Sequence, residues 1–349
     1  MLACILRAVD RHAGLLRCSA SCVGNEHRLG AQEAPPAIIS IFLGDQLENV
    51  VEQIVSNADS IQLLAAGKLD SGVASVPVIT KDATDRNRTS PFAFTGNKFE
   101  FRMVGSSDTI ADANITLNAI VAQALSEAAD ILEKAEDFNA ACTELIHDWM
   151  SQHQRVVFNG NGYSDEWVAE AVRRGLPNLR SLVDAVPYLM TDETVKLYGE
   201  FGIYTKSELE ARAEIRYETY AKVLRIEAKT MIHMASKHYI PAAITYTTRL
   251  GQSIASVSAA CPDADIAVQK GLLTKVSTLL SQASEALEQL KVLSAKVDGM
   301  ENVAEMANAY HDLIVPAMKA LRTPVDELEL LVDKDIWPVP TYGDLMFEV

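Results

Sequence analysis

Hydrophobic residues recur at helical spacing over most of the chain. Beyond residue 110, apolar side chains lie three or four positions apart, which is typical of helices with one buried face. The pattern predicts five long helices, at residues 112–137, 140–157, 206–239, 264–297 and 299–322. Because only a short segment around Gly299 separates the last two, we expect them to form an antiparallel helical hairpin.

The first third of the chain has a different pattern, in which strands stand among the helices. The β-branched run AIISIFL at 37–43 predicts a buried strand, and residues 45–66 return to helical spacing. The segment NKFEFRM at 97–103 alternates apolar and charged residues, which predicts a strand with two unlike faces. We therefore expect a part with strands followed by a larger helical part.

The first residues carry an apolar stripe of their own. Leu2, Ile5, Leu6, Val9 and Leu16 recur at helical spacing, which favours a helix packed on the core over a targeting peptide. A mature domain seldom begins inside a buried helix without a residue that caps it. We therefore expect that the start of this sequence is truncated.

The net charge of the chain restricts its partners. With 47 acidic and 31 basic residues, the formal charge is −16, which opposes binding to nucleic acids and to anionic membranes because both need a basic surface. No run of 18 uninterrupted apolar residues suggests a membrane span. The five cysteines are few and odd in number, as is typical of free thiols in a reducing compartment, and we expect a cytoplasmic protein.

Three charged segments in the first third are candidates for chemistry. Lys98, Glu100 and Arg102 share one face of the strand at 97–103, so they can converge on one ligand; the alternative is a charged face in water. The loop DRNRTS offers arginine and hydroxyl groups suited to phosphate or carboxylate oxygens. The loop HRLGAQEAPPA holds an arginine and a glutamate in a stretch that proline restricts. Each loop alone is equally compatible with a charged surface turn.

Together these segments resemble the catalytic domain of glutamine synthetases. The family's arginine–leucine pair followed by glutamate–alanine–proline matches Arg28-Leu29 and Glu33-Ala34-Pro35. Its arginine–asparagine–arginine–serine loop matches residues 86–89, with Thr89 in place of serine, and its glutamate-x-arginine strand matches Glu100-Phe101-Arg102. Three longer segments are similar to the type III branch: HRLGAQEAPPAIISIFLGDQL, DRNRTSPFAFTGNKFEFRM and FNGNGYSDEW. The resemblance runs over most of the chain.

The resemblance implies both a fold and an activity. The fold would be α+β, with residues 1–138 as the C-terminal part of the catalytic domain, built on antiparallel strands, and residues 139–349 as a helical C-terminal region with a long hairpin. The activity would be that of a glutamate–ammonia ligase, which forms glutamine through γ-glutamyl phosphate. Its substrates would be ATP, glutamate and ammonium, its cofactor Mg²⁺ or Mn²⁺, and its assembly a homo-oligomeric ring.

The resemblance also implies a role for each candidate residue. Glutamate would be bound by Arg28 and Arg102, and the ATP phosphates would be contacted by Arg88 and, as a supplementary group, Lys98. The metal ligand would be Glu100. Glu33 would be the catalytic carboxylate on a flap, where it helps to deprotonate ammonium, since a carboxylate can both attract that cation and accept its proton.

Some features depart from the family pattern. The spacing between Arg28 and Glu33 is one residue shorter than in the commoner bacterial type, and Ala93 stands where that type has a further arginine; both fit the type III branch. The family's earlier metal-binding glutamates and its substrate-binding glycine loop have no counterpart here. We therefore expect the chain to be inactive alone; the alternative is a non-catalytic paralogue that assembles with full-length subunits.

Two further motifs are not expected to bind ligands. His233 and His238 are five residues apart, and on an α-helix they would not share a face. The GNG within NGNGYSDEW lacks a preceding strand and the full pattern of a dinucleotide loop. We expect it to be a turn before a helix that Ser164 or Asp165 caps.

Overall fold

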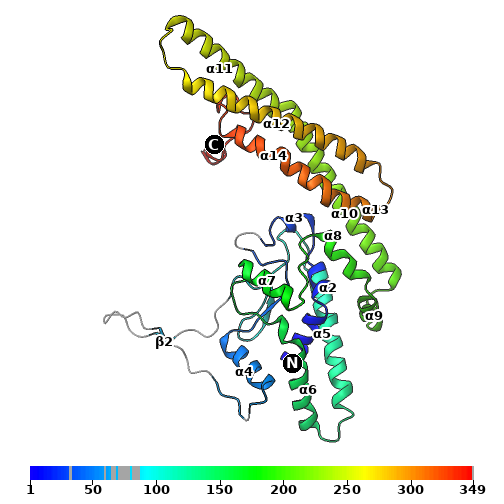
Figure 1. The fold of residues 1–349 in the computed structure, drawn as a ribbon. Helices are drawn as coiled ribbons and strands as arrows, with labels where there is room; N and C mark the ends of the chain where they lie inside the picture. Colours follow the sequence, from blue (N-terminus) through cyan, green and yellow to red (C-terminus); the bar gives the residue numbers. More distant parts are fainter. Residues whose placement is uncertain (31–33, 59, 64–67, 70–78, 81–86, 348–349) are drawn as a thin grey trace. The chain divides into compact units, whose positions relative to one another are not determined.

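A computed structural model describes the whole chain except residues 31–33, 59, 64–67, 70–78, 81–86 and 348–349. The chain divides into two compact units, Met1–Ala213 and Glu214–Val349, and both can be followed in Figure 1. The division falls within helix α10 (Lys206–Met234). The domain boundary expected after residue 138 concerns the family's domains and stays a prediction.

Helix α1 (Leu2–Arg11) lies in the core of the first unit. It packs against α5 (Ala111–Leu132) and α6 (Phe138–His153), and the side chains of Leu6 and Val9 are completely buried. After His12 the chain continues as α2 (Ala13–Cys18), where Leu16 is also fully buried. The expected core-packed helix at the start of the chain is therefore confirmed, although it is divided in two.

Helix α5 is long and apolar enough to cross a membrane by length and composition alone. The core helix of a globular unit passes the same test, and α5 contacts α1, α2, α6 and α9 (Asp192–Glu200). Its buried face includes Ala119, Ile120 and Ala124, and Gln123 and Thr116 are buried beside them. These residues form the face of the helix that packs in the first unit, and about a third of its most apolar 18-residue stretch is buried.

The sheet of the first unit has three short strands in the order β1-β4-β5. They are β1 (Ile41–Phe42), β4 (Phe92–Phe94) and β5 (Phe99–Phe101). The expectation of antiparallel strands is correct for β4 with β5, but β1 pairs with β4 in parallel, so the sheet is mixed. A parallel pair needs a long connection, and residues 43–91 supply it. A separate antiparallel pair joins β2 (Lys68–Leu69) and β3 (Ile79–Thr80).

The buried strand predicted at residues 37–43 is buried but mostly unpaired. Ile38, Ile39 and Ile41 are at most 1% exposed, yet only Ile41–Phe42 enters the sheet, while Ile38 forms an isolated bridge with Asn178. The hydrophobic pattern predicts that a segment is buried, but it does not predict which strand the segment pairs with.

The remaining elements of the first unit are short helices and 3-10 turns: α3 (Val23–Glu26), α4 (Asp45–Val55), η1 (Gln154–Val156), α7 (Asp165–Arg173), α8 (Leu182–Ala185) and η2 (Val186–Met190). The helix predicted at 45–66 is shorter than expected, because α4 ends at Val55. Ser164 caps α7, as predicted, by accepting a hydrogen bond from the backbone N–H of Trp167 at 3.2 Å.

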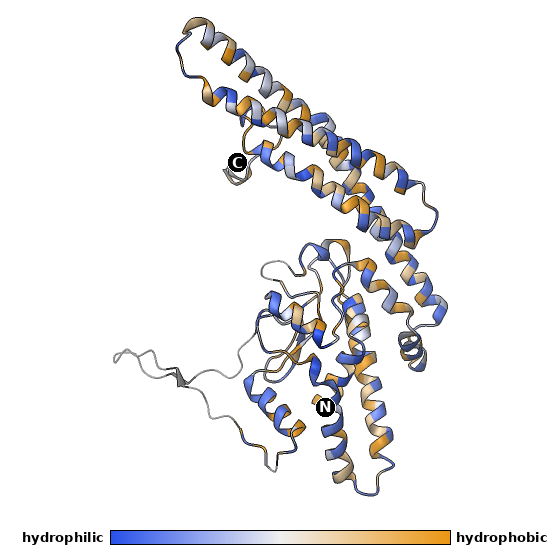
Figure 2. Ribbon diagram, viewed as in Figure 1, coloured by the Kyte–Doolittle hydropathy of each residue, from blue (hydrophilic) through white to orange (hydrophobic). Residues whose placement is uncertain are grey.

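The second unit consists of long helices packed side by side. Helix α12 (Ala267–Asp298) packs against α11 (Ile240–Ala260) and against α14 (Val315–Glu329), which confirms the predicted hairpin. Figure 2 shows hydrophobic and hydrophilic residues mixed along each helix, and the apolar seam of α12 runs through Leu279, Leu287 and Leu290. The other elements are η3 (Ala235–Tyr239), α13 (Val303–Ala309), η4 (Tyr310–Ile314) and α15 (Tyr342–Phe347).

Two of the predicted long helices run past their predicted ends, and each contains a π-helical turn that a proline follows. The predicted helix 206–239 stops before Pro241, and 299–322 stops before Pro324. In the structure, α10 continues through η3 into α11, with Pro241 near its start, while α13 continues through η4 into α14, with Pro316 near its start. Proline cannot donate to the preceding turn, and a wider π turn relieves this conflict. Pro324 lies inside α14 without ending it.

The same π turn changes the relation of two histidines. The rings of His233 and His238 lie 5.7 Å apart in an edge-to-face arrangement, so the expectation that they would not share a face is wrong. That expectation assumed 3.6 residues per turn, whereas His238 lies within the π turn η3, which begins two residues after His233. No group of three potential metal-ligating side chains includes them in the part of the chain that the structure describes.

Candidate active site

The charged side chains of β5 and its flanking residues converge as predicted. Arg102 Nη2 donates to Glu100 Oε2 at 3.0 Å, and Lys98 Nζ lies 3.5 Å from Glu100 Oε1. The opposite face of the strand carries Phe99 and Phe101, which line an apolar groove of about 400 Å³ against α5. Alternation along the strand therefore separates a charged face from an apolar one.

The charge balance of this face favours an anion. Glu100 is the one carboxylate between two cations, and the hydrogen bond from Arg102 lowers the pKa of Glu100 below its ordinary value, opposed by some desolvation. A cluster with one surplus positive charge attracts phosphate and carboxylate groups. We refer to Lys98, Glu100 and Arg102 as the strand triad.

Arg28 reaches the end of the same strand from the loop after α3. Its Nη1 donates to the carbonyl of Met103 and its Nη2 to that of Arg102, each at 3.2 Å. Asn25 supports this position, because its Nδ2 donates to the carbonyl of Met103 at 2.8 Å. The structure therefore brings Arg28 beside the strand triad, although Arg28 and Arg102 are 74 positions apart in sequence.

The arginine–asparagine–arginine–threonine loop is attached to the strand triad through Asn87. Arg102 Nη1 donates to the carbonyl of Asn87 at 2.7 Å. The side-chain Oδ1 of Asn87 accepts from the backbone N–H of Thr89 at 2.9 Å and from its hydroxyl at 2.6 Å. Arg88 lies between them with its side chain exposed, and none of the residues that the structure describes forms an ion pair with it. Its guanidinium is therefore presented to solvent beside the strand triad.

A second asparagine, Asn159, also forms a hydrogen bond with this loop. Asn159 Oδ1 accepts from the backbone N–H groups of Leu43 and Gly44, at 2.9 and 3.2 Å, and its Nδ2 donates to Glu48 at 2.6 Å. Its carbonyl accepts from Asn87 Nδ2 at 3.2 Å. Asn159 thus joins the end of β1, the first turn of α4 and the arginine loop.

Gly162 allows its own loop to lie close to the arginine loop at Thr89. Its N–H donates to Thr89 Oγ1 at 2.8 Å, and a Cβ added there would lie 2.6 Å from the carbonyl oxygen of Thr89. The sequence of this segment predicts only a turn before a helix, without this contact. Asparagines flanked by glycines are the signal that was available, because such residues combine a tight backbone with a short group that both donates and accepts.

Two residues of the implied site lie outside the described residues: Glu33, the implied catalytic carboxylate, and Arg86, the first arginine of the loop. The metal role of Glu100 stays a prediction. Mg²⁺ takes about six oxygen ligands, whereas the strand triad offers one carboxylate and no group of three potential ligands occurs among the described residues. The triad therefore does not fit a complete metal site by itself.

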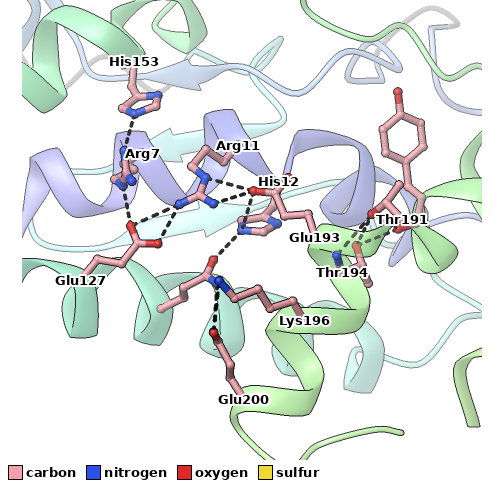
Figure 3. Close-up of polar contacts among 12 residues, drawn as sticks. Arg7, Arg11, His12, Glu127, His153, Thr191, Glu193, Thr194, Lys196 and Glu200 are labelled. Atoms are coloured by element: carbon pink, nitrogen blue, oxygen red, sulfur yellow. Dashed lines mark hydrogen bonds and ion pairs between the residues drawn. The ribbon is translucent and has the colours of Figure 1, made fainter. Parts of the chain in front are cut away.

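A larger polar network lies away from the strand triad, between α1, α5 and α9. Figure 3 shows Glu127 between Arg7 and Arg11, with Oε2 2.8 Å from Arg7 Nε and Oε1 2.8 Å from Arg11 Nη1. Arg11 also pairs with Glu193 at 2.7 Å. Desolvation opposes ionisation of Glu127, but the bonds from both arginines outweigh it and lower the pKa of this carboxyl. Each of these groups is neutralised by its neighbours, which is typical of a structural network.

Asp10 anchors the same region from inside. Its side chain is 3% exposed and accepts from His153 Nδ1 and from Arg155 Nε, each at 2.7 Å. The other ring nitrogen of His153 accepts from Arg7 Nη1 at 3.1 Å, so the bonds assign the proton of this ring to Nδ1. These contacts join α1 to α6 and to the turn that follows it.

Known proteins were compared with the chain as a whole. The family model described as the glutamine synthetase C-terminal domain matches residues 141–258. The chain is 40% identical to a type-3 glutamine synthetase of Dictyostelium discoideum over 99% of its own length and 48% of the relative's. It is 37% identical to a glutamine synthetase of Butyrivibrio fibrisolvens over 99% of its own length and 49% of the relative's. It is 35% identical to one of Bacteroides fragilis over 98% and 48%.

The chain therefore spans about half the length of the curated relatives that it matches. These matches include almost every residue of the chain, so they cover the strand triad, the arginine loop and both helical hairpin partners. On this combination of matches and motifs, the chain is similar over almost its whole length to proteins named glutamine synthetase, one of them a type-3 glutamine synthetase.

Proposed function

We propose that this chain supplies glutamate- and ATP-facing residues to a glutamate–ammonia ligase. The observation that carries the proposal is the convergence of Arg28, Arg102, Lys98 and Glu100 at one strand end, in a chain whose relatives are named glutamine synthetases. A cationic strand end suits a reaction between two anions, a carboxylate and a phosphate chain.

The reaction brings like charges together before it forms a bond. The γ-carboxylate of glutamate attacks the terminal phosphorus of ATP, the bond to the leaving ADP oxygen breaks, and γ-glutamyl phosphate forms. Positioned arginines lower the repulsion and stabilise charge on the transferring phosphoryl group. Arg102 suits this task because Asn87 and Glu100 hold its guanidinium at 2.7 and 3.0 Å. Its side chain therefore loses little conformational entropy when a substrate binds.

In the second step ammonia attacks the acyl carbon and phosphate leaves. Ammonium must first lose a proton, and we assign the acceptor role to Glu33, because a carboxylate both attracts the cation and takes its proton. Arg88, exposed at the tip of the loop, would contact the phosphates, with Lys98 as a supplementary contact.

Glu100 would supply one oxygen ligand to a divalent ion, Mg²⁺ or Mn²⁺, which would add charge neutralisation at the phosphates when bound. The other ligands would have to come from outside the described residues, so no step above depends on that ion. We also infer a cytoplasmic, ring-forming protein. The resemblance to the family supports the ring, and the small, odd number of cysteines supports the location.

The proposal is tested in the native-length protein by phosphate release that depends on ATP, glutamate and ammonium together. We expect Arg102→Lys to raise the KM for glutamate by about tenfold or more, because lysine keeps the charge but loses the planar fork of donors. Glu100→Gln is expected to abolish turnover while the far-UV circular dichroism stays unchanged.

Arg173→Lys is the matched control, since the side chain of Arg173 is 74% exposed and, among the residues that the structure describes, forms an ion pair with Glu170 alone. Retained turnover in Glu100→Gln would remove the metal role from that residue. If the native-length protein releases no phosphate but copurifies with a longer active relative, the ligase proposal fails and the role of a non-catalytic assembly partner takes its place.

A further inference from the structure

The second unit contains a cavity that the ligase chemistry does not use. It has a volume of about 310 Å³ and lies between the end of α10, the π turn η3, α14 and the segment before α15. Its apolar wall includes Met231, Met234, Leu321, Val325 and Trp337. This volume is near the lower end of the range for small-molecule sites, so the cavity suits a small ligand with an apolar body.

The rim of the cavity is charged, with a surplus of acid. Arg322 and Asp326 pair with each other at 2.9 Å. Glu329, the last residue of α14, also lines the cavity and forms no ion pair within the part of the chain that the structure describes. Its carboxylate is therefore available to a positively charged group.

Aromatic rings stand next to this carboxylate. Tyr239 and Trp337 are stacked with ring centroids 5.2 Å apart, and both line the cavity. Burial raises the pKa of Tyr239, and the negative charges of Glu329 and Asp326 raise it further, in keeping with an acidic rim close to this ring. Aromatic faces beside a carboxylate are the surroundings that attract an ammonium group.

Two independent features of the backbone and side chains mark the same wall. Ala235 and Tyr239, which bound the π turn η3, both line the cavity, and π turns are rare and occur frequently at functional sites. Trp337, which lines the cavity, has a buried indole Nε1 with no hydrogen-bond partner among the residues that the structure describes. Such buried groups are uncommon, and a site that rearranges when it is occupied is one physical reason for them.

We propose that this cavity binds a small organic amine, with its apolar body against the methionines and Trp337 and its ammonium group between Glu329 and the aromatic pair. Glu329 is the specificity-determining residue, because the apolar wall alone does not distinguish an amine from an alcohol. The site rests on contacts within the second unit and is independent of the proposed ligase activity.

The probe for the test is 2-phenylethylamine, titrated into the full chain while tryptophan fluorescence and heat of binding are recorded. We expect saturable binding, and binding at least fivefold weaker for 2-phenylethanol, which has the same body without the charge. Glu329→Gln is expected to weaken amine binding about fivefold and to leave alcohol binding unchanged. This variant is expected to fold, because a negative charge at a helix C-terminus is unfavourable and glutamine removes it.

Glu327→Gln is the matched control, since Glu327 lies two residues away on α14, faces Lys275 at 3.8 Å and does not line the cavity; its amine affinity should equal that of the parent. Trp337→Phe should remove the fluorescence change while calorimetry still detects binding. Equal affinity for amine and alcohol, or an unchanged affinity in Glu329→Gln, would overturn the proposal. Sedimentation velocity supplies a further test. If the chain self-associates and Glu329→Gln abolishes this self-association, the proposal is also overturned, because a second copy of the chain would then occupy the cavity.

Discussion

The two units of this chain use charged residues in opposite ways. In the first unit, several ion pairs join segments far apart in sequence and are partly or fully buried, such as Asp10 with His153 and Arg155. In the second, many are exposed pairs one helical turn apart, such as Glu218 with Lys222 and Arg322 with Asp326. Long, regular helices bury an apolar seam and leave their charges in water, whereas short, irregular elements need polar contacts to define their positions.

This difference explains why the candidate active site lies in the irregular unit. The strand triad, Arg28 and the arginine loop are positioned by backbone carbonyls and by two asparagines. Regular helices satisfy their own carbonyls and offer few such acceptors. A site that must hold several cations close together is therefore better placed among short strands and loops.

The largest effect is expected in the apolar seam of the second unit. Leu290 on α12 is fully buried, and Leu290→Ala should lower the free energy of unfolding by about 3 kcal/mol, through lost burial and the remaining cavity. Urea denaturation followed by circular dichroism measures it. Val292→Ala, at a position that is 67% exposed two residues away, is the control and should change stability by less than about 0.5 kcal/mol. Equal effects at both positions would contradict the assigned seam.

A polar substitution should have the next largest effect, and in the first unit. Asp10→Asn removes the charge that faces His153 and Arg155 at 2.7 Å. We expect a loss of about 2 kcal/mol in the free energy of unfolding, which is less than for a fully buried pair because Arg155 is 46% exposed. The same denaturation experiment measures it, with Asp148→Asn on the exposed side of α6 as the control. No loss would mean that apolar packing alone holds α1 against α6.

Acid should affect the first unit through Glu127. The bonds from Arg7 and Arg11 lower the pKa of Glu127 from its ordinary 4.5, so its stabilising effect is fully present above that value and is lost as the pH falls through the lowered pKa. Glu127→Gln should therefore flatten the decline of stability between about pH 5 and pH 3. Denaturation midpoints across this range measure it, and Glu144→Gln, at an exposed position, should keep the slope of the parent.

The smallest effect is expected from an exposed pair of the second unit. The carboxylate of Glu218 lies 2.7 Å from Lys222 one helical turn away, and both side chains are more than half exposed. Glu218→Gln should change the free energy of unfolding by at most about 0.5 kcal/mol, because solvent and salt screen such pairs. A thermal melt at low and high salt measures it. A loss as large as that of Asp10→Asn would erase the contrast between the two units.

The sequence pattern predicted the helical part well and the sheet only in outline. The apolar period located the long helices of the second unit except α11, which begins where the predicted helix 206–239 was expected to end. On the strand, alternation correctly grouped Lys98, Glu100 and Arg102. Alternation is a local property of the chain, so it can be recognised without knowledge of what lies opposite.

The positioning residues could not be predicted in the same way. Asn159 contacts Leu43, Gly44 and Glu48, which lie more than 100 residues earlier, and nothing in its own segment indicates these partners. The closeness of His233 and His238 was also missed, because it depends on a wider helical turn. Both cases depend on geometry that pattern analysis does not contain.

By itself, the sequence determined the family motifs, the acidic charge, the helical character of the rear part and the charged face of one strand, since each depends on residue type and spacing. Only the tertiary structure decided that β1 joins the sheet in parallel, that Arg28 and Asn87 meet Arg102, and that a cavity with an acidic rim opens beside Trp337. Those features arise from contacts between distant segments, which short-range periodicity cannot encode.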